Sequence, residues 1–177
     1  SRMSTLEVNT IDSVSGTSTL TLGSSNAGTI ALGSGDVQSN FLQPNFHVYL
    51  NSNQTLSNST QTVVQFATEL WDSDSKYNTS TYKFTPTIAG KYFLYSQLRF
   101  NTTTNFDSIQ CSIFQNTTEV GRGQMINDNN NTCCVSAFVD SDTDDYFQVQ
   151  AFQNSGGDAA VGGFQAISYF LGFRIGT

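Results

Sequence analysis

The stretch Tyr82–Phe100, YKFTPTIAGKYFLYSQLRF, decides the fold, because it holds two strand patterns that are joined by a turn. On both sides of the turn, aromatic and branched side chains alternate with polar ones, which is the period of a β-strand. Between the two patterns, Pro86 cannot donate a ladder hydrogen bond, and Gly90 can adopt a positive φ angle. The sequence therefore predicts that one strand ends at Pro86 and that the chain reverses into the next strand at Gly90.

The second strand of this stretch carries aromatic side chains on both of its faces. Tyr92, Leu94 and Leu98 alternate with a second row that contains Phe93 and Tyr95. A strand in a sheet that is buried on one side needs only one apolar row. We therefore assign the first row to the core of the subunit and expect the second row to contact another subunit.

Short motifs along the chain carry a family resemblance. They read Phe46-His47-Val48, Tyr77-Asn78, Phe84-Thr85-Pro86, Gly90-Lys91-Tyr92-Phe93 and Phe170-Leu171-Gly172-Phe173. In order and spacing, these motifs resemble the signature of the complement-1q and tumour necrosis factor superfamily. The resemblance implies an all-β fold, an antiparallel jelly-roll sandwich, and a homotrimer.

The composition limits the class of protein. Only 12% of the 177 residues are charged, against roughly a quarter in typical soluble domains. The surface is therefore built from Ser, Thr, Asn and Gln, which favours an extracellular or virion-surface protein over a cytosolic enzyme. The net charge is −7 and there are only seven Lys and Arg residues, so we expect no nucleic-acid partner.

No segment has the pattern of a signal peptide or offers about twenty uninterrupted apolar residues. The most apolar stretch, Ala159–Ile175, is interrupted by glycines and by Arg174, so we expect no membrane insertion. We interpret the opening Ser1-Arg2-Met3 as either a remnant of expression or a fragment boundary, and we expect the chain to be a piece of a longer protein.

The N-terminal part differs from the rest, because residues 4–40 contain no aromatic side chain. Within it, Thr19–Ser24 (TLTLGS) returns as Thr29–Ser34 (TIALGS). Each unit reads as a short strand followed by a glycine turn, and one unit alone cannot bury its aliphatic row. Three chains around a common axis can bury these rows, as in the shafts of viral fibres. We therefore predict a β-rich repeat neck in residues 1–40 and a jelly-roll head in residues 41–177, with a flexible Ser/Gly linker as the alternative to the neck.

The head is predicted to consist of strands with polar loops between them. The expected strands are residues 45–50, 61–69, 81–86, 90–101, 107–116, 119–126, 132–139, 145–153 and 163–175. The last two also carry apolar residues on both faces, which indicates a sheet covered by its partner sheet on one side and by neighbouring subunits on the other. The side chains expected at the trimer interface are Phe93, Tyr95, Tyr146, Phe152 and Phe170.

Three cysteines, Cys111, Cys133 and Cys134, leave at least one thiol unpaired within a subunit. Cys133 and Cys134 are neighbours in a predicted strand and so face opposite sides. A cross-strand disulfide between Cys111 and Cys133 and buried free thiols are both compatible with this pattern. No Cys-x-x-Cys spacing occurs and His47 is the only histidine, which argues against a zinc site.

The densest acidic run lies at residues 140–145. Asp140, Asp142 and Asp144 are spaced like ligands of a calcium loop, but the run lacks the Gly and the final Glu of an EF-hand. We interpret it as a solvated turn before a strand, keep calcium as the lesser alternative, and assign no metal and no cofactor.

We expect no enzyme activity, because a single histidine excludes most acid–base constellations and neither a Gly-x-Ser-x-Gly elbow nor a phosphate-binding glycine motif occurs. A repeat neck that leads to a jelly-roll head is typical of the end of a viral or phage fibre. We predict that the head attaches a virion to a host-cell receptor, either a glycan or a protein, and gains avidity from three copies of each loop.

Trp71, Tyr77 and Tyr82 are the candidate receptor-binding residues, because exposed aromatic rings can stack on sugars. Burial in the core is the alternative fate of such side chains. The alternative function is that of a structural surface or coat protein, whose head serves to nucleate trimerisation of a stalk.

Overall fold

The computed structural model describes residues 44–101, 106–126 and 132–176, and within these ranges the protein is all β, as predicted. The predicted neck, residues 1–40, lies outside the described residues, so its structure and its boundary with the head stay predictions. Nowhere in the described ranges is there a helix with the length and hydrophobicity needed to cross a membrane.

The strands are β1 (Asn45–Tyr49), β2 (Gln54–Leu56), β3 (Thr62–Val63), β4 (Thr68–Asp72), β5 (Tyr77–Asn78), β6 (Lys83–Phe84), β7 (Gly90–Asn101), β8 (Ser108–Gln115), β9 (Thr118–Ile126), β10 (Thr132–Ser141), β11 (Phe147–Asn154), β12 (Ala159–Val161) and β13 (Tyr169–Gly176).

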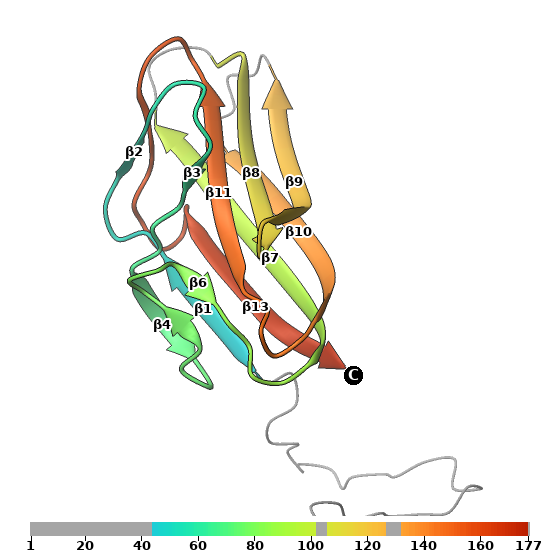
Figure 1. The fold of residues 1–177 in the computed structure, drawn as a ribbon. Helices are drawn as coiled ribbons and strands as arrows, with labels where there is room; N and C mark the ends of the chain where they lie inside the picture. Colours follow the sequence, from blue (N-terminus) through green and yellow to red (C-terminus); the bar gives the residue numbers. More distant parts are fainter. Residues whose placement is uncertain (1–43, 102–105, 127–131, 177) are drawn as a thin grey trace, which may run out of the picture. The chain divides into compact units, whose positions relative to one another are not determined.

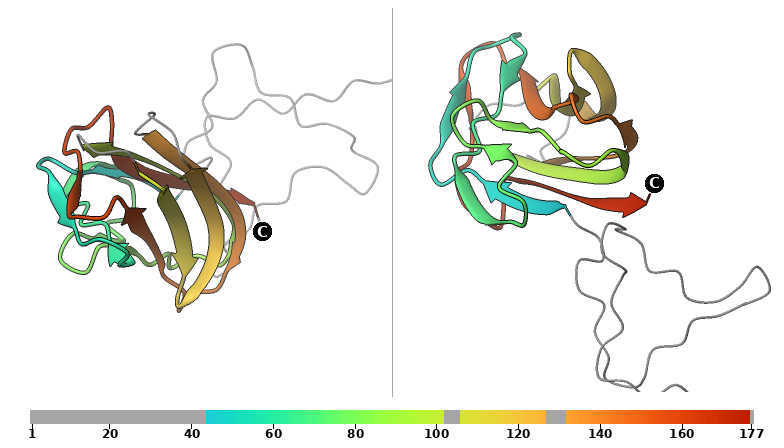
Figure 2. Two further views of the ribbon diagram at one scale, coloured as in Figure 1. Left: turned by 90° about the horizontal axis from the view of Figure 1, so that it is seen from above. Right: turned by 60° about the horizontal axis from the view of Figure 1, so that its bottom comes forward.

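The strands form two antiparallel sheets that lie face to face (Figure 1; Figure 2). In the first sheet the order is β2-β12-β7-β13-β1-β4, and β10 pairs with the part of β7 that β12 leaves free. In the second sheet the order is β5-β6-β11-β8-β9, and β3 pairs with β11. The last strand, β13, lies between β1 and β7, so segments far apart in the sequence form the centre of the first sheet.

β7 has the two rows that its sequence predicts. Tyr92, Leu94, Leu98 and Phe100 on the inner row are fully buried, whereas Phe93 on the outer row is only partly buried. Because the inner row is removed from water along the whole strand, β7 anchors the first sheet to the core.

The predicted turn before β7 is also present. Gly90 has a φ of 143°, and a β-carbon there would overlap the carbonyl oxygen of Gly176. The hydroxyl of Tyr92 donates a hydrogen bond to the carbonyl oxygen of Ile88 at 2.6 Å, which ties the turn to the strand that follows it.

One hydrophobic core fills the space between the sheets. Phe46 of β1 lies at the centre, with its ring centroid 4.2 Å from that of Phe84 and 4.9 Å from that of Phe170. Phe84 belongs to the second sheet and also contacts the rings of Tyr92 and Phe147. These ring contacts link the two layers and hold their outer faces in fixed positions.

The two sheets approach each other along one side, where β9 lies against β10. A β-carbon on Gly121 would lie 3.1 Å from the carbonyl oxygen of Ser136, and a β-carbon on Gly123 would overlap the carbonyl oxygen of Cys134. Glycine at these two positions therefore lets one backbone come close to the other.

The structure differs from the predicted strands between residues 51 and 72. The predicted strand 61–69 is divided into β3 and β4, and β2 lies within a predicted loop. The side chain of Gln54 explains the division, because its Nε2 donates to the carbonyl oxygen of Val63 at 2.7 Å and its Oε1 accepts from the backbone N–H of Gln65 at 2.8 Å. The side chain of Gln54 thus makes the two backbone hydrogen bonds that a neighbouring strand would otherwise make.

Candidate functional site

The outer face of the first sheet, on the side away from the core, is covered by aromatic side chains. Phe93 of β7 lies between Phe138 of β10 and Phe173 of β13, with ring centroids 5.1 and 5.4 Å away. Along β7, the ring of Tyr95 lies 5.9 Å from that of Tyr169. We define the aromatic face as the outward side chains of His47, Trp71, Phe93, Tyr95, Phe138, Tyr169, Leu171 and Phe173.

The aromatic face is open to solvent in the single chain. Phe138 is 74% exposed and Trp71 is 52% exposed, and Phe93 and Tyr95 are partly exposed. A contiguous apolar surface of this kind on a soluble domain marks an interaction site. The face is therefore the main candidate contact surface of the molecule.

His47 is the polar member at one side of the aromatic face. Its ring lies 4.9 Å from the ring of Trp71 and 5.2 Å from that of Tyr169. Among the described residues, no group forms a hydrogen bond with its covered Nε2 atom, and burial lowers the pKa of His47. The neutral imidazole is therefore favoured, and the face carries no formal charge at neutral pH.

The predicted interface residues fall in three different places, namely the outer sides of the two sheets and the core. Phe93 and Tyr95 lie on the aromatic face. Tyr146 and Phe152 lie on the outer side of the second sheet, where the Lys83 ammonium stands 3.6 Å from the centroid of the Tyr146 ring. Phe170 is fully buried in the core, so its assignment to the interface was wrong.

The error at Phe170 has a simple cause in β13. Both rows of this strand are apolar, so alternation alone does not identify the inner row. Register decides it, because Phe170 pairs with the small Ser96 and Gly172 pairs with the large Leu94. Large and small side chains thus complement each other on the inner row, and Tyr169 is turned outward.

Several members of the aromatic face were missed by the sequence analysis, namely His47, Phe138, Tyr169, Leu171 and Phe173. The sequence around Phe138 did contain a pattern that could have identified it as part of a contact surface. In β10 it shares a row with the polar residues Cys134 and Ser136, and an aromatic side chain in such an exposed row indicates a contact surface.

The three candidate receptor-binding residues do not form one site. Tyr77 is 6% exposed and its ring is stacked on that of Phe46, so its assignment to a receptor-binding surface was wrong. Trp71 belongs to the aromatic face. Tyr82 is partly exposed and lies at the wall of a polar hollow.

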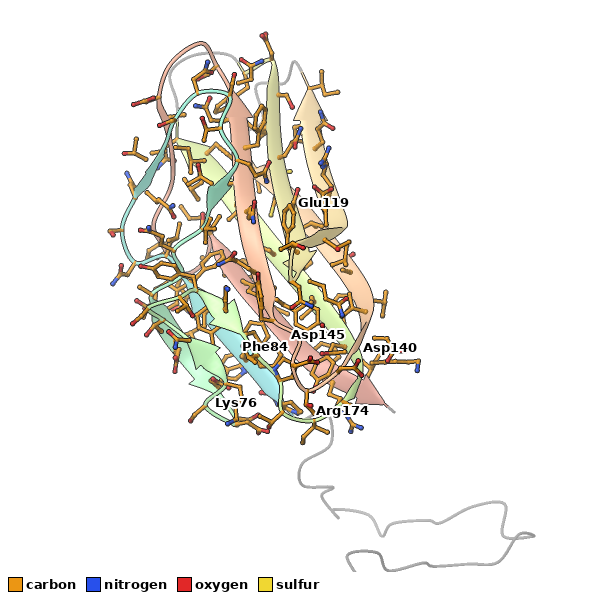
Figure 3. The ribbon with its side chains drawn as sticks, in the orientation of Figure 1. Lys76, Phe84, Glu119, Asp140, Asp145 and Arg174 are labelled. Atoms are coloured by element: carbon orange, nitrogen blue, oxygen red, sulfur yellow. The ribbon has the colours of Figure 1, made fainter. Side chains whose placement is uncertain are left out.

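Two polar hollows border the turn at residues 78–82. The first, which we call the Tyr82 hollow, has a volume of about 430 Å³ and is lined by residues 50–55, Thr62, Gln65, Ala67 and Tyr82. The second, which we call the Lys76 hollow, has a volume of about 540 Å³ and is lined by residues 75–80, Thr85 and Thr87. Lys76 is labelled in Figure 3, near the turn between β4 and β5.

Solved structures with the same arrangement of strands identify the fold. Eiger TNF from S. frugiperda matches with a TM-score of 0.57 and 14% identity, over 73% of this chain and 90% of that chain. Murine APRIL matches with a TM-score of 0.58 and 13% identity, over 73% and 97% of the two chains. The globular domain of zebrafish complement 1qA matches with a TM-score of 0.50 and 17% identity, over 75% and 96%. The fold is the complement-1q and tumour necrosis factor jelly roll.

The predicted resemblance is thereby confirmed at the level of the fold. The sequence matches no family model and no curated protein. At sequence identities of 13–17%, the likeness to these structures concerns the fold alone. The function of this chain depends on the side chains at its surface.

The acidic turn of the jelly roll is organised by Asp145. Its carboxylate accepts hydrogen bonds from Gln115 Nε2 at 2.8 Å, Asn116 Nδ2 at 2.6 Å and the backbone N–H of Asp142 at 2.9 Å. Burial acts to raise the pKa of Asp145, but the three hydrogen bonds outweigh burial, so its pKa is lowered. The turn is thus closed by hydrogen bonds to one carboxylate.

The residues of the calcium alternative are arranged differently. Asp140 Oδ2 lies 3.8 Å from the Nζ atom of Lys91, and Figure 3 shows Asp140 and Asp145 at the end of the jelly roll where β13 ends. Within the three described ranges, no group of three or more His, Cys, Asp or Glu side chains is placed to hold a metal ion. The geometry therefore gives no support to calcium at Asp140, Asp142 and Asp144.

The three cysteines of the jelly roll are free thiols. Cys111 and Cys133 are buried, and burial raises the pKa of both, to about 11 for Cys133. Of the two alternatives, the structure shows the buried thiols and not the cross-strand disulfide. Cys134 faces outward, with its Sγ 3.7 Å from Gln97 Oε1.

Proposed function

We propose that this jelly roll is the head of a homotrimeric fibre on a virion surface, and that it attaches the virion to a glycan or protein receptor on the host cell. The observation that carries the proposal is the aromatic face. A second and a third copy of the chain would cover it and remove its rings from water, which is favourable by about 25 cal/mol per Å² of apolar area.

The two outer sides of the molecule differ in a way that supports this choice of interface. The outer row of β7 carries Phe93 and Tyr95, and both neighbouring strands extend the row with further aromatic rings. On the outer side of the second sheet, Phe152 pairs with Gln110 and Phe114 pairs with Gln148, so each of these rings stands beside a polar side chain. The outer side of the first sheet is therefore the more apolar of the two and the better suited to contact with other subunits.

A trimer assembled through the aromatic face would also favour attachment to a cell. A trimer displays each loop three times, so a receptor site that is weak in one subunit gains avidity when the receptors are clustered on a cell. Tyr82 remains the candidate receptor contact, because it is partly exposed and lies outside the aromatic face that the trimer would cover, whereas Trp71 belongs to that face.

The oligomeric state is the first test. Sedimentation equilibrium of the full chain and of residues 41–177 should give three times the mass of one chain, which is 19.3 kDa for the full chain. A trimer of residues 41–177 alone would assign assembly to the head. A monomer in both cases would overturn the proposal.

Attachment is tested next, with a fluorescent trimer on a panel of bacterial and animal cells. Saturable binding to at least one cell type is expected. A trimer that binds no cell at any concentration would instead favour the alternative function, a structural surface or coat protein whose head nucleates trimerisation of a stalk.

A further inference from the structure

We infer that the Tyr82 hollow is a binding site for an uncharged carbohydrate. This inference rests on the proposed attachment function and names the receptor class and the site. The hollow has about 430 Å³ of space, within the range of about 300–1,000 Å³ that is usual for small-ligand sites.

The side chains that line the hollow have the chemistry to bind hydroxyl groups. Amides and hydroxyls predominate, from residues 51–55, Thr62 and Gln65, and the lining contains no Asp, Glu, Lys, Arg or His. Each amide offers both a donor and an acceptor, which suits the paired hydroxyls of a sugar ring. The absence of charge from the lining disfavours phosphate, carboxylate and ammonium groups as ligands.

Part of the wall is held in place by hydrogen bonds within the protein. Both ends of the Gln54 amide are used, at Val63 and at Gln65. Asn53 Oδ1 accepts a hydrogen bond from the backbone N–H of Gly163 at 2.9 Å, and a β-carbon on Gly163 would overlap the backbone of Ser52. The hollow is therefore preformed, and a ligand does not need to order it.

Other polar groups in the wall are free to bind a ligand. The side chains of Asn51 and Gln65 are exposed, and neither makes a hydrogen bond to any residue of the described ranges. A wall that combines fixed amides with free amides offers both a rigid shape and unused hydrogen-bonding capacity.

Tyr82 adds an aromatic ring to this polar wall. Its φ of 59° is a left-handed conformation that is unfavourable for a tyrosine, and its backbone N–H donates to the carbonyl oxygen of Asn78 at 2.7 Å. Backbone strain that the surrounding structure maintains is often found at binding sites. The ring supplies an apolar surface for the C–H face of a sugar, next to the amides that bind its hydroxyls.

The Lys76 hollow is the competing site, because its one cation suits an acidic sugar. However, Asp72 lies in the same turn, where its Oδ2 accepts a hydrogen bond from the backbone N–H of Tyr77 at 2.6 Å. The net charge of the whole chain is −7, which also disfavours an anionic ligand. We therefore assign the carbohydrate to the uncharged hollow.

A glycan array with the full chain tests the assignment. The array carries neutral oligosaccharides that end in glucose, galactose or N-acetylhexosamines, together with sialylated forms of the same chains. Binding to at least one neutral glycan is expected. Isothermal titration with that glycan should then show Gln65→Ala and Asn51→Ala each weakening Kd about tenfold, the loss of one or two hydrogen bonds.

Two matched variants serve as controls. Gln61→Ala removes an exposed amide from the same segment but outside the hollow, and Lys76→Ala removes the cation of the other hollow. Both should leave Kd unchanged. Circular dichroism should show all four variants folded, since every substituted side chain lies at the surface.

Three outcomes would overturn the inference. They are binding only to sialylated glycans with loss in Lys76→Ala, neutral binding that Gln65→Ala and Asn51→Ala leave unchanged, and no glycan binding by a trimer that does bind cells. The last outcome leaves attachment intact and points to a protein receptor. A trimer that binds neither glycans nor cells would overturn the proposed function as well.

Discussion

Gly123 shows at the scale of one residue why the two sheets can join. A β-carbon at this position would overlap the carbonyl oxygen of Cys134, and both backbones are held by ladder hydrogen bonds, β9 to β8 and β10 to β7. We expect Gly123→Ala to lower the free energy of unfolding by about 3 kcal/mol, measured by urea denaturation. Gly157→Ala is the matched control, because the space around Gly157 is open, and it should change stability by less than about 0.5 kcal/mol. Equal effects of the two variants would contradict the close approach of β9 to β10.

Two fully buried serines, Ser96 and Ser112, should respond differently in stability to substitution by alanine. Ser96 Oγ donates a hydrogen bond to the carbonyl oxygen of Tyr169 at 2.9 Å, whereas Ser112 Oγ has no partner among the described residues. Ser96→Ala should therefore cost about 1 kcal/mol, and Ser112→Ala should be neutral or stabilising by up to about 1 kcal/mol. Denaturation midpoints of the two variants, measured side by side, check the prediction. A clear loss of stability in Ser112→Ala would mean that its hydroxyl does have a partner.

The lowered pKa of Asp145 predicts a pH dependence. The pKa of the folded state lies below the ordinary value of 3.8, so the carboxylate stabilises the fold above that value, and this contribution is lost as the pH falls through the folded-state pKa. At about pH 7, Asp145→Asn should lower stability by about 1 kcal/mol, a modest figure because the group is partly exposed. The difference from the unsubstituted protein should shrink below about pH 4.

Asp144→Asn is the control for this prediction. Asp144 is an exposed neighbour in the same turn, so its substitution should have little effect on stability at any pH. A difference between Asp145→Asn and the unsubstituted protein that stays constant down to about pH 2 would contradict the role of the carboxylate.

At the scale of elements, β7 is the strand on which the core and the proposed interface depend together. Its inner row is buried between the sheets, and its outer row forms the middle of the aromatic face. A substitution on the outer row should therefore separate assembly from folding. A substitution on the inner row should affect both.

Tyr95→Asp should cost assembly before it costs folding. Tyr95 lies on the outer row of β7, where it is partly exposed and its ring is 5.9 Å from that of Tyr169, so its side chain is not part of the core. In the trimer, an aspartate there would be buried without a partner charge, which typically costs several kcal/mol per buried ion. Sedimentation velocity should show a monomer, while the far-ultraviolet circular dichroism spectrum stays unchanged.

Gln110→Asp is the matched control, because Gln110 occupies an outer row of the second sheet. This variant should remain a trimer. A monomer in Gln110→Asp together with a trimer in Tyr95→Asp would move the interface to the second sheet, where Tyr146 and Phe152 lie.

At the scale of the whole molecule, the proposed assembly through the aromatic face would couple folding to association. The thermal midpoint of a trimer that unfolds to monomers rises with protein concentration. For a head of this size, a tenfold increase in concentration should raise the midpoint by on the order of 3 °C. Differential scanning calorimetry measures the shift, and Tyr95→Asp should abolish it. A midpoint independent of concentration in the unsubstituted protein would count against an obligate trimer.

The sequence was informative where side chains of different polarity alternate over many residues. β7 was predicted with its two rows and its turn, because Tyr92 and Leu94 on one row and Lys91 and Arg99 on the other follow a clear period. The short strands β2 and β12 were missed, since three residues are too few to show a period. Their pairing depends on contacts between Thr55 and Ala160, which are far apart in the chain.

The candidate site could be predicted only in part. Phe93 and Tyr95 were assigned to an outer face from the sequence, but the rings that complete this face come from β1, β4, β10 and β13. The Tyr82 hollow was not predicted as a site, because its walls come from segments that meet only after folding.

The opening stretch, Tyr82–Phe100, was sufficient by itself to predict two strands, the turn between them and a central strand with two different faces. This is so because alternation and turn chemistry act between neighbours in the chain. Only the tertiary structure decided which row faces the core where both rows are apolar, as Phe170 and Tyr169 of β13 show. The physical reason is that the inner row is chosen by how its side chains fit those of the next strand, with Phe170 beside Ser96 and Gly172 beside Leu94.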